Sequence, residues 1–373
     1  YVDRFTLPHI RRMARAGARA RALVPVFPSL TFPNHYSLAT GLTPERHGIV
    51  SNSFYDPGLR ARYSLSDRAA VADARWYRGE PIWVTAETQG MVAACFFWPG
   101  SEAPINGVRP TLWRPYDGGI PNDERVDTVL EWLRLPSERR PHLVTLYFSQ
   151  LDSVSHEHPL NAPAIERAAQ SLDRTIGRLM AGIAGLPDGD RVYILLTSDH
   201  GMAEVTPSQE LSLDAMVDMS SIEAAFGGPV ASLHVRGGAG NAVAIRDRLN
   251  ARLKNGRAYL RRELPPRFRY RGDPRAGDIV VVMDESWPLI TGLRRIARPF
   301  LGRRGMHGWD PALPSMHALF IASGPDIRAG AVIPQVEMVD LYPFMTELLG
   351  LRPARDVDGR AGHLRQQIVD TVR

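Results

Sequence analysis

Two apolar runs, residues 142–148 and 191–197, are each followed closely by side chains that can bind a metal ion. The runs are short and lie between helix-like stretches, which predicts buried strands of a parallel sheet with helices on both faces. The polar residues behind the two runs are Asp152, His156, Asp199 and His200. Loops at the carboxyl ends of such strands converge on one crevice. If both strands belong to one sheet, these side chains can meet there with the distant His307 and Thr31.

The candidate ligands suit zinc or a similar divalent ion, because such ions accept mixed imidazole and carboxylate ligands. Taken singly, each residue has a simpler explanation: an aspartate after a strand commonly forms a turn, and a lone histidine such as His307 is usually a hydrogen-bonded polar residue. His158 could replace His156, since nothing in the local sequence separates the two. The specific signal is the combination of Asp-X-X-X-His and Ser-Asp-His-Gly behind two buried strands.

Thr31 lies where a Pro- and Ser-rich loop meets a helix expected from Asn34 to Thr40. Threonine is a preferred N-cap, and a hydroxyl at that position lies beside unpaired N–H groups and the positive end of the helix dipole. Such a position suits a phosphate. The simpler alternative is that Thr31 only caps the helix.

The rest of the chain allows one large α/β domain or two smaller ones, since it has 373 residues. Further elements are predicted as helices at 7–16, 126–135, 162–183 and 339–348, and as a returning strand at 317–322. Strand, helix and strand patterns between 230 and 283 predict a small inserted subdomain over about residues 225–300. The polar stretch 56–79 is expected to be irregular. The loop 99–122, which contains Tyr116, is long enough to border a site.

Composition narrows the class of protein. No apolar run approaches the roughly 18 residues of a membrane span. The single cysteine, Cys95, excludes a disulfide within the chain and is expected to be buried. The net charge of +5 includes two Arg-dense runs, 261–271 and 294–304. Phe268 and Tyr270 in the first run give a weak hint of a nucleic-acid platform, but no recognisable motif contains either run, so solvated surface is the favoured interpretation.

Taken together, these pieces resemble the nucleotide pyrophosphatase/phosphodiesterase family of the alkaline phosphatase superfamily. The matching segments are Phe32-Pro33-Asn34 after Thr31, Ala39-Thr40-Gly41-Leu42, Pro44-Glu45, His47-Gly48-Ile49-Val50, Asn52, Tyr55-Asp56, Asp152 with His156, Ser198-Asp199-His200-Gly201-Met202, and His307-Gly308. They agree in order and spacing and extend over essentially the whole chain. The resemblance implies one catalytic domain over residues 1–373, an alkaline phosphatase-like α/β/α sandwich with a mostly parallel central sheet.

The resemblance also implies a site with two Zn²⁺ ions. One ion would be held by Asp152, His156 and His307, and the other by Asp199, His200 and the oxygen of Thr31. Thr31 would be the nucleophile and Asn52 would donate its amide to a phosphoryl oxygen. Phe32 and Tyr147 would flank a pocket for a nucleobase.

The chemistry of these residues fits that assignment. A threonine hydroxyl is a weak nucleophile at neutral pH, and a bound dication favours its ionised form. Asn52 and N–H groups near Phe32 can meet the charge on the phosphoryl oxygens. The implied function is hydrolysis of nucleotide phosphodiester or pyrophosphate bonds through a phosphoryl- or nucleotidyl-threonine. The substrate would be a small molecule, with no need for a nucleic-acid polymer.

The sequence leaves more than one function open. The chain could be a phosphomonoesterase, a phosphonate hydrolase or a phospholipid-type phosphodiesterase of the same superfamily. It could also be an inactive fragment with the same fold, because the family places a further aspartate ligand on a first strand that would precede Tyr1. Asp3 is the nearest candidate, but no strand precedes it. We therefore expect a sheet that lacks its first strand, in a protein whose relatives are exported to the periplasm or secreted.

Overall fold

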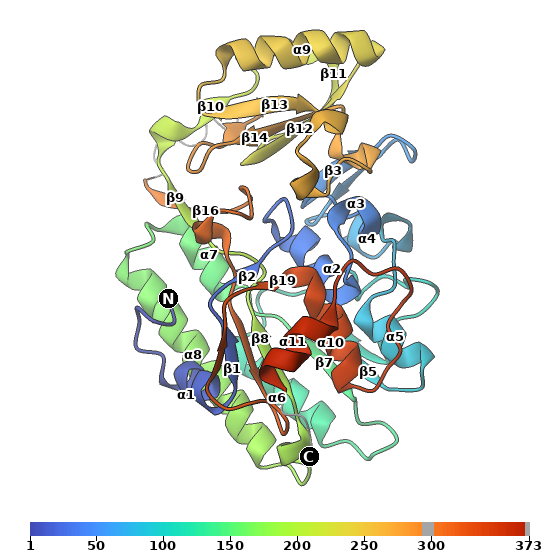
Figure 1. Cartoon of the computed structure of the whole chain (residues 1–373), viewed down its shortest axis with the longest axis vertical. Coiled ribbons are helices and arrows are strands. Elements are labelled where there is room, and N and C mark those ends of the chain that lie inside the picture. Colours follow the sequence, from blue (N-terminus) through green and yellow to red (C-terminus); the bar gives the residue numbers. More distant parts are fainter. Residues whose placement is uncertain (293–301, 370–373) are drawn as a thin grey trace.

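The computed structural model describes residues 1–292 and 302–369 (Figure 1). A large lower body contains both labelled chain ends, and a smaller upper sheet covered by helix α9 stands above it. The two tiers meet near α3 and β3 on one side and near β9 and β16 on the other. The candidate residues of the site come almost entirely from the lower body.

The lower body holds its main strands in two sheets. The first, in the order β6-β5-β7, is parallel throughout, with strands β6 (Leu112–Arg114), β5 (Ala93–Phe96) and β7 (Leu143–Leu146). The second has the order β18-β1-β17-β8, with strands β18 (Ala331–Ile333), β1 (Ala18–Ala20), β17 (Phe320–Ser323) and β8 (Ile194–Thr197). Strand β17 is the predicted returning strand, and it runs antiparallel to both of its neighbours. The α/β class is therefore confirmed, with a mixed second sheet where a mostly parallel one was expected.

Strands β7 and β8 face each other across a cavity of about 1800 Å³, which residues from both strands line. Among the described residues, β7 pairs only with β5 and β8 only with β17. Each strand therefore presents one unpaired edge to the cavity. We call this space the slot.

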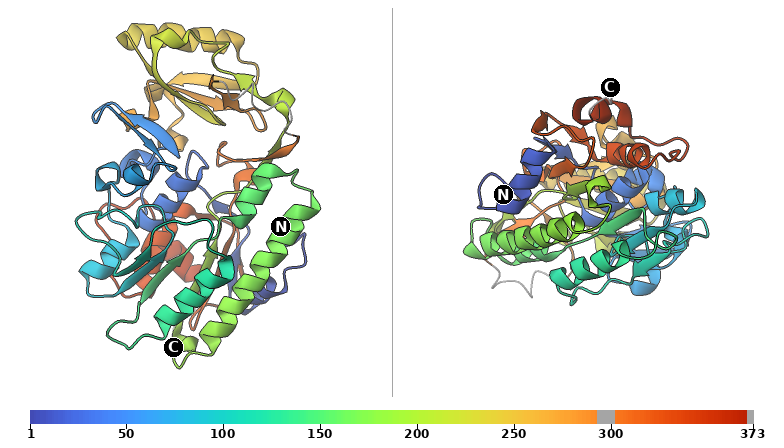
Figure 2. Two further views of the ribbon diagram at one scale, coloured as in Figure 1. Left: turned by 180° about the vertical axis from the view of Figure 1, so that it is seen from behind. Right: turned by 90° about the horizontal axis from the view of Figure 1, so that it is seen from below.

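Helices cover both faces of these strands, as the view from below shows (Figure 2). On one face lie α6 (Asn122–Leu133), α8 (Pro163–Ala184) and α1 (Pro8–Ala16), and on the other lie α10 (Leu341–Leu348) and α11 (Ala361–Ile368). The sequence of α8 explains its position, because Ile165, Ala169, Ile176 and Ile183 recur at helical spacing and are all buried. Among the described residues, the other α-helices of the lower body are α2 (Thr31–Thr40), α3 (Pro44–His47), α4 (Arg68–Val71), α5 (Ile82–Thr88) and α7 (Gln150–Glu157).

The upper sheet is antiparallel and has the order β11-β12-β14-β13. Its strands are β11 (Ile222–Phe226), β12 (Val230–Val235), β14 (Ile279–Met283) and β13 (Gly256–Leu260), and α9 (Gly238–Arg252) packs against β13 and β12. The expected subdomain range contains most of this sheet, and its last residues, 293–300, lie outside the described residues. The same holds for residues 294–301 of the second Arg-dense run.

Short paired strands complete the structure. They are β3 (Ser53–Asp56) with β4 (Ala61–Ser64), β2 (Leu23–Val24) with β19 (Val336–Glu337), β9 (Ala203–Val205) with β16 (Arg304–Met306), and β10 (Leu211–Ser212) with β15 (Leu289–Ile290). The hairpin β3–β4 corrects the expectation of an irregular stretch at 56–79. The alternation of apolar and polar residues that marks a strand is weak in this hairpin. Phe54 and Tyr63, which stack on each other in the core, are among its few apolar residues.

Three smaller predictions also have outcomes. Cys95 is buried in β5, and burial raises the pKa of its thiol to about 12. Every described helix is too short or too polar to span a membrane.

Phe268 and Tyr270 are buried against Phe27 and offer no surface for stacking bases, so the prediction of a nucleic-acid platform was wrong. Nearby arginines are ion-paired: Arg267 with Asp310 and Arg269 with Asp358.

Candidate metal and active site

The structure brings the five aspartate and histidine residues that were predicted as metal ligands into one cluster. Asp152 Oδ1 lies 3.4 Å from His156 Nε2 and 3.7 Å from His307 Nε2. Asp199 Oδ2 lies 3.1 Å from His200 Nε2. The rings of His200 and His307 stack with centroids 3.5 Å apart, which joins the two groups.

Local structure explains how distant residues reach this cluster. Asp152 and His156 are four residues apart on α7, so they share one face of the helix. Asp199 and His200 follow directly after β8, and His307 follows β16. His156, not His158, is the histidine beside Asp152, because α7 ends at Glu157 and His158 follows it.

Each of the three histidines is held through its Nδ1 atom by a backbone carbonyl, which can only accept a hydrogen bond. The bonds run from His156 to Gly305 (3.1 Å), from His200 to Gly201 (2.9 Å) and from His307 to Ser29 (2.9 Å). Nδ1 therefore carries the proton, and Nε2 is the atom left for the cluster. Metal-bound histidines in proteins show this arrangement.

Two buried atoms of the cluster, Asp152 Oδ1 and His200 Nε2, have no hydrogen-bond partner. An unpaired buried polar atom is costly unless something else satisfies it. Ligand atoms of Asp152, His200 and His307 all lie within 4.8 Å of one another. The donor set and its unpaired atoms therefore fit a divalent metal ion, and these three residues form a candidate metal-binding triad.

The electrostatics differ between the two aspartates. Burial raises the pKa of Asp152, and the nearby His156 and His200 offset only part of that shift. Burial also disfavours the charge on Asp199, but His200 and His35 outweigh it and hold the pKa of Asp199 well below its usual range. Burial and the neighbouring His200 keep the pKa of His307 well below normal, so His307 is neutral, as a ligand must be.

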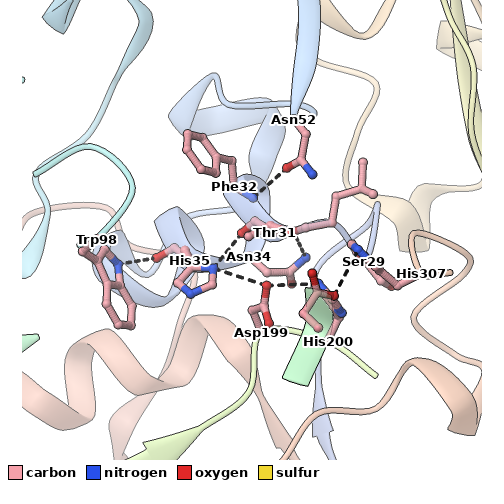
Figure 3. A network of polar contacts seen from close by, with 12 residues as sticks. Ser29, Thr31, Phe32, Asn34, His35, Asn52, Trp98, Asp199, His200 and His307 are labelled. Atoms are coloured by element: carbon pink, nitrogen blue, oxygen red, sulfur yellow. Dashed lines mark hydrogen bonds and ion pairs between the residues drawn. The ribbon is translucent and has the colours of Figure 1, made fainter. Parts of the chain in front are cut away.

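Thr31 is the first residue of α2, and Leu30 occupies the N-cap position without a side-chain cap. The helix therefore begins three residues before the expected Asn34, and the interpretation of Thr31 as a capping residue was wrong. Figure 3 shows Thr31 between Asn52 on one side and Asp199 with His200 on the other. The hydroxyl-bearing residue thus lies at the junction of helix and ligand cluster.

Asn52 is oriented by the backbone of the same helix. Its Oδ1 atom accepts a hydrogen bond of 2.8 Å from the N–H of Phe32. This bond leaves the amide nitrogen of Asn52 as the free donor. In this arrangement the Phe32 N–H is occupied, so of the expected donors it is the Asn52 amide that remains free.

His35 is a site residue that the sequence analysis missed. Its Nδ1 lies 2.9 Å from the carbonyl oxygen of Thr31 and 3.3 Å from Asp199 Oδ2 (Figure 3). The ring is buried and packs edge-on against Trp98, whose Nε1 donates to the His35 carbonyl. The available signal was spacing, since His35 follows Thr31 by one helical turn.

Asn34 of the Phe-Pro-Asn motif holds the loop that precedes Thr31. Its side chain is fully buried, accepts from the N–H of Val26 and donates to the carbonyls of Pro28 and Leu30. These bonds fix the loop in which the Ser29 carbonyl holds His307. The motif therefore shapes the ligand cluster through the backbone.

The two predicted aromatic residues pack against different neighbours. The Phe32 ring packs near Tyr63, and the Tyr147 ring packs edge-on against His35 at 5.0 Å. The ring centroid of Tyr116 lies 6.5 Å from that of Tyr147, and Tyr116 is 42% exposed to solvent. Asp3 is outside the site, since its exposed carboxylate pairs with Arg19.

Comparison with solved structures first defines the fold. The chain superposes on murine ectonucleotide pyrophosphatase/phosphodiesterase 5 with a TM-score of 0.90 at 28% identity, covering 98% of this chain and 95% of that one. For the human counterpart the TM-score is 0.91 at 27% identity, with coverages of 99% and 96%. The protein therefore has the alkaline phosphatase-like α/β fold.

Sequence comparison then gives the family. The model of the type I phosphodiesterase/nucleotide pyrophosphatase family matches residues 1–310. Ectonucleotide pyrophosphatase/phosphodiesterase family member 1 of Rattus norvegicus is 36% identical over 98% of this chain and 41% of the rat protein. Venom phosphodiesterase CdcPDE of Crotalus durissus collilineatus is 35% identical over 96% of this chain and 43% of its own length. The chain belongs to the type I phosphodiesterase/nucleotide pyrophosphatase family, and it spans about two-fifths of the length of these relatives.

Proposed function

We propose that this protein is a hydrolase that cleaves phosphodiester or pyrophosphate bonds of nucleotides, with Thr31 as its nucleophile. The observation that carries the proposal is the position of Thr31 at the start of α2, between Asn52 and the pair Asp199 and His200. The unpaired buried atoms of Asp152 and His200 support a metal-dependent reaction at that position.

Two divalent ions of the zinc type fit the donor set. Asp152, His156 and His307 would hold one, and Asp199, His200 and the Thr31 oxygen the other. Such ions, when bound, supply positive charge that favours the ionised hydroxyl and the charged phosphoryl group. His35 holds Asp199 in place through its ring, in the way that second-layer groups orient metal ligands.

The chain's own residues then account for the two steps. The Thr31 oxygen bonds to phosphorus while the bond to the alcohol or phosphate leaving group breaks, and the leaving group departs with that electron pair. This leaves a phosphoryl- or nucleotidyl-threonine, which water hydrolyses to regenerate Thr31. The free amide of Asn52 donates to a phosphoryl oxygen, and its bond to Phe32 keeps the amide in that orientation.

A nucleotide is the favoured substrate class because several aromatic rings lie close to the site. Phe32 follows the nucleophile directly, Tyr147 packs against His35, and Tyr116 packs near Tyr147. An inactive threonine-to-alanine variant of the murine relative has been solved in complex with AMP, which fits both a threonine nucleophile and a nucleotide ligand.

Steady-state assays with an aryl phosphodiester and the matching aryl monoester test the reaction class. We expect the diester to be cleaved faster, because Phe32 offers an apolar wall to its second ester group. Faster cleavage of the monoester would indicate a phosphomonoesterase instead. Faster cleavage of a phosphonate or a lipid head-group diester than of a nucleotide would contradict the nucleotide assignment and indicate a phosphonate hydrolase or a phospholipid-type phosphodiesterase.

We further propose that the slot between β7 and β8 receives an extended strand that brings an additional carboxylate to the Asp199 side of the site. Both strand edges are unpaired among the described residues, and Tyr1 and Val2 line the same cavity. Metal content and activity of this chain, measured beside those of an N-terminally extended chain, test the idea. We expect tighter metal binding and faster turnover in the longer chain, and equal values would contradict the proposal.

Export to the periplasm or secretion is proposed from the relatives, which are named as ecto-enzymes and venom enzymes. Fractionation of cells that express the full coding sequence would test it. Recovery of the protein only from the cytoplasm would contradict this location.

A further inference from the structure

A segment of the upper tier, Tyr270–Arg275 between β13 and β14, lies against the loop that carries Asn52. The Tyr270 hydroxyl donates a hydrogen bond of 2.7 Å to the Val50 carbonyl. Arg275 Nη1 donates to the Gly48 carbonyl at 2.9 Å. Two carbonyls of the loop are therefore held by the chain segment that connects two strands of the upper sheet.

Arg275 also binds the other end of this loop. Its Nε donates to Asp56 Oδ2 at 2.6 Å, and its Nη1 donates to the Trp76 carbonyl at 2.7 Å. The guanidinium is buried and lies over the rings of Phe54 and Trp76. One side chain thus connects residues on both sides of Asn52.

The fit around this guanidinium is close. Gly48 has a φ of +86°, and a Cβ atom at that position would lie 2.6 Å from Arg275 Nη1. A side chain there would both strain the backbone and displace Arg275. Position 48 therefore has to be a glycine for Arg275 to keep its bonds to the loop.

Asn52 itself has two further backbone or side-chain bonds, and the loop before it is also held by the buried side chains of Ile49 and Val50. The Asn52 carbonyl accepts the N–H of Leu65 across the β3–β4 hairpin at 2.9 Å, and its side-chain oxygen accepts the N–H of Phe32. Neither bond fixes the backbone at residues 48–50, which precede Asn52. In that part of the loop the N–H groups of Gly48 and Ile49 bond to the Pro44 carbonyl and to His47 Nδ1, whereas the Gly48 and Val50 carbonyls are held by Arg275 and Tyr270.

We propose that Tyr270 and Arg275 are positioning residues for Asn52, through which the upper tier sets the direction of the phosphoryl-binding amide. The inference rests on the proposed function of Asn52. Neither residue contacts the reacting atoms. Small errors in the placement of a catalytic donor cost large factors in rate, so the effect would appear mainly in kcat.

The test is a double-mutant cycle with Asn52→Ala. Tyr270→Phe removes only the hydroxyl, and Arg275→Lys keeps the positive charge beside Asp56 while losing the forked contacts. We expect the combined variant to lower kcat for an aryl phosphodiester about tenfold, with a smaller change in KM. In the Asn52→Ala background the same two substitutions should change kcat less than about twofold, because the amide that they position is already absent.

The matched control is Arg246→Met, which breaks an ion pair with Glu263 in the upper tier away from this loop. It should leave kcat unchanged in both backgrounds. Equal losses from the Tyr270/Arg275 pair with and without Asn52 would overturn the inference while leaving the proposed function intact. If Asn52→Ala and Thr31→Ala themselves retain full activity, the proposed function fails and this inference fails with it. Tyr270→Phe alone, the mildest change, keeps the cycle decisive if Arg275→Lys does not fold.

Discussion

The two halves of the ligand cluster are built from the same residue types but differ in how far the protein itself satisfies them. Asp199 lies within 3.3 Å of two histidine rings, and its side chain is 15% exposed. Asp152 is 32% exposed, and its Oδ1 has no hydrogen-bond partner. The pKa of Asp199 is lowered and that of Asp152 is raised. The carboxylate of Asp199 is thus satisfied by neighbouring histidines, whereas the carboxylate of Asp152, like the Nε2 atom of His200, still lacks a partner that a bound cation would supply.

The largest expected effect on turnover comes from replacing the proposed nucleophile Thr31, which lies beside Asp199 and His200. Thr31→Ala should lower kcat by a factor of about 10³ or more, because no other hydroxyl takes its place. Thermal unfolding should change little, since Thr31 makes no capping bond. Near-normal turnover of an aryl phosphodiester by this variant would remove Thr31 from the mechanism.

Removal of one carboxylate at a time tests whether the halves hold separate ions. Asp152→Asn and Asp199→Asn should each lower turnover by about 10²-fold or more, because even outer partners of metal ligands cost about 10- to 100-fold. Elemental analysis should find about one ion lost in each variant. Asp127→Asn, which breaks a surface pair with Arg178, serves as the control. Loss of all metal from both variants would show that the halves share one ion, as the close Asp152, His200 and His307 triad also allows.

His35→Gln should reduce kcat by an intermediate factor and should alter metal binding only at Asp199 and His200. Because His35 contacts Asp199 and the Thr31 carbonyl, its loss should reduce kcat about tenfold while leaving the Asp152 half loaded. Zinc titration followed by activity would measure this. The exposed His142→Gln is the matched control. An unchanged kcat would mean that His35 serves packing alone.

The smallest effect concerns the stability of the metal-free protein, in which the two carboxylates should act with opposite sign. The folded state raises the pKa of Asp152 above 3.8, so its ionised form is destabilising at pH 7, and Asp152→Asn should raise Tm by a few degrees. The folded state lowers the pKa of Asp199, so its charge stabilises the protein at every pH above about 4, and Asp199→Asn should lower Tm.

The pH dependence separates the two cases. The increase in Tm from Asp152→Asn should vanish as the pH falls toward about 4. The wild-type carboxyl is then protonated in the folded state and no longer carries a destabilising charge. The loss from Asp199→Asn should persist there, since that carboxyl stays ionised until still lower pH. Melting curves in chelator at several pH values give both results. Tm changes of the same sign at pH 7 would contradict the distinction between the halves.

Much of the lower body follows from local patterns. The strands β7, β8 and β17 and the helices α1, α8 and α10 lie where apolar runs and helical spacing predict them. The helix start at Thr31 was misplaced, because the Pro33 ring in the first turn is compatible with a start on either side of it. The β3–β4 hairpin was missed because its pairing depends on contacts with the core and not on its own alternation.

The sequence by itself determined the residue types of the site and their attachment to strand ends, since spacing along a helix or behind a strand is a local property. Only the tertiary structure decided which histidine faces Asp152, that His35 supports Asp199, and that the upper tier holds the Asn52 loop. The contacts of the upper tier join residues far apart in the chain, since Arg275 and Gly48 are separated by 227 positions. Their geometry comes from packing of the whole chain, which no local pattern encodes.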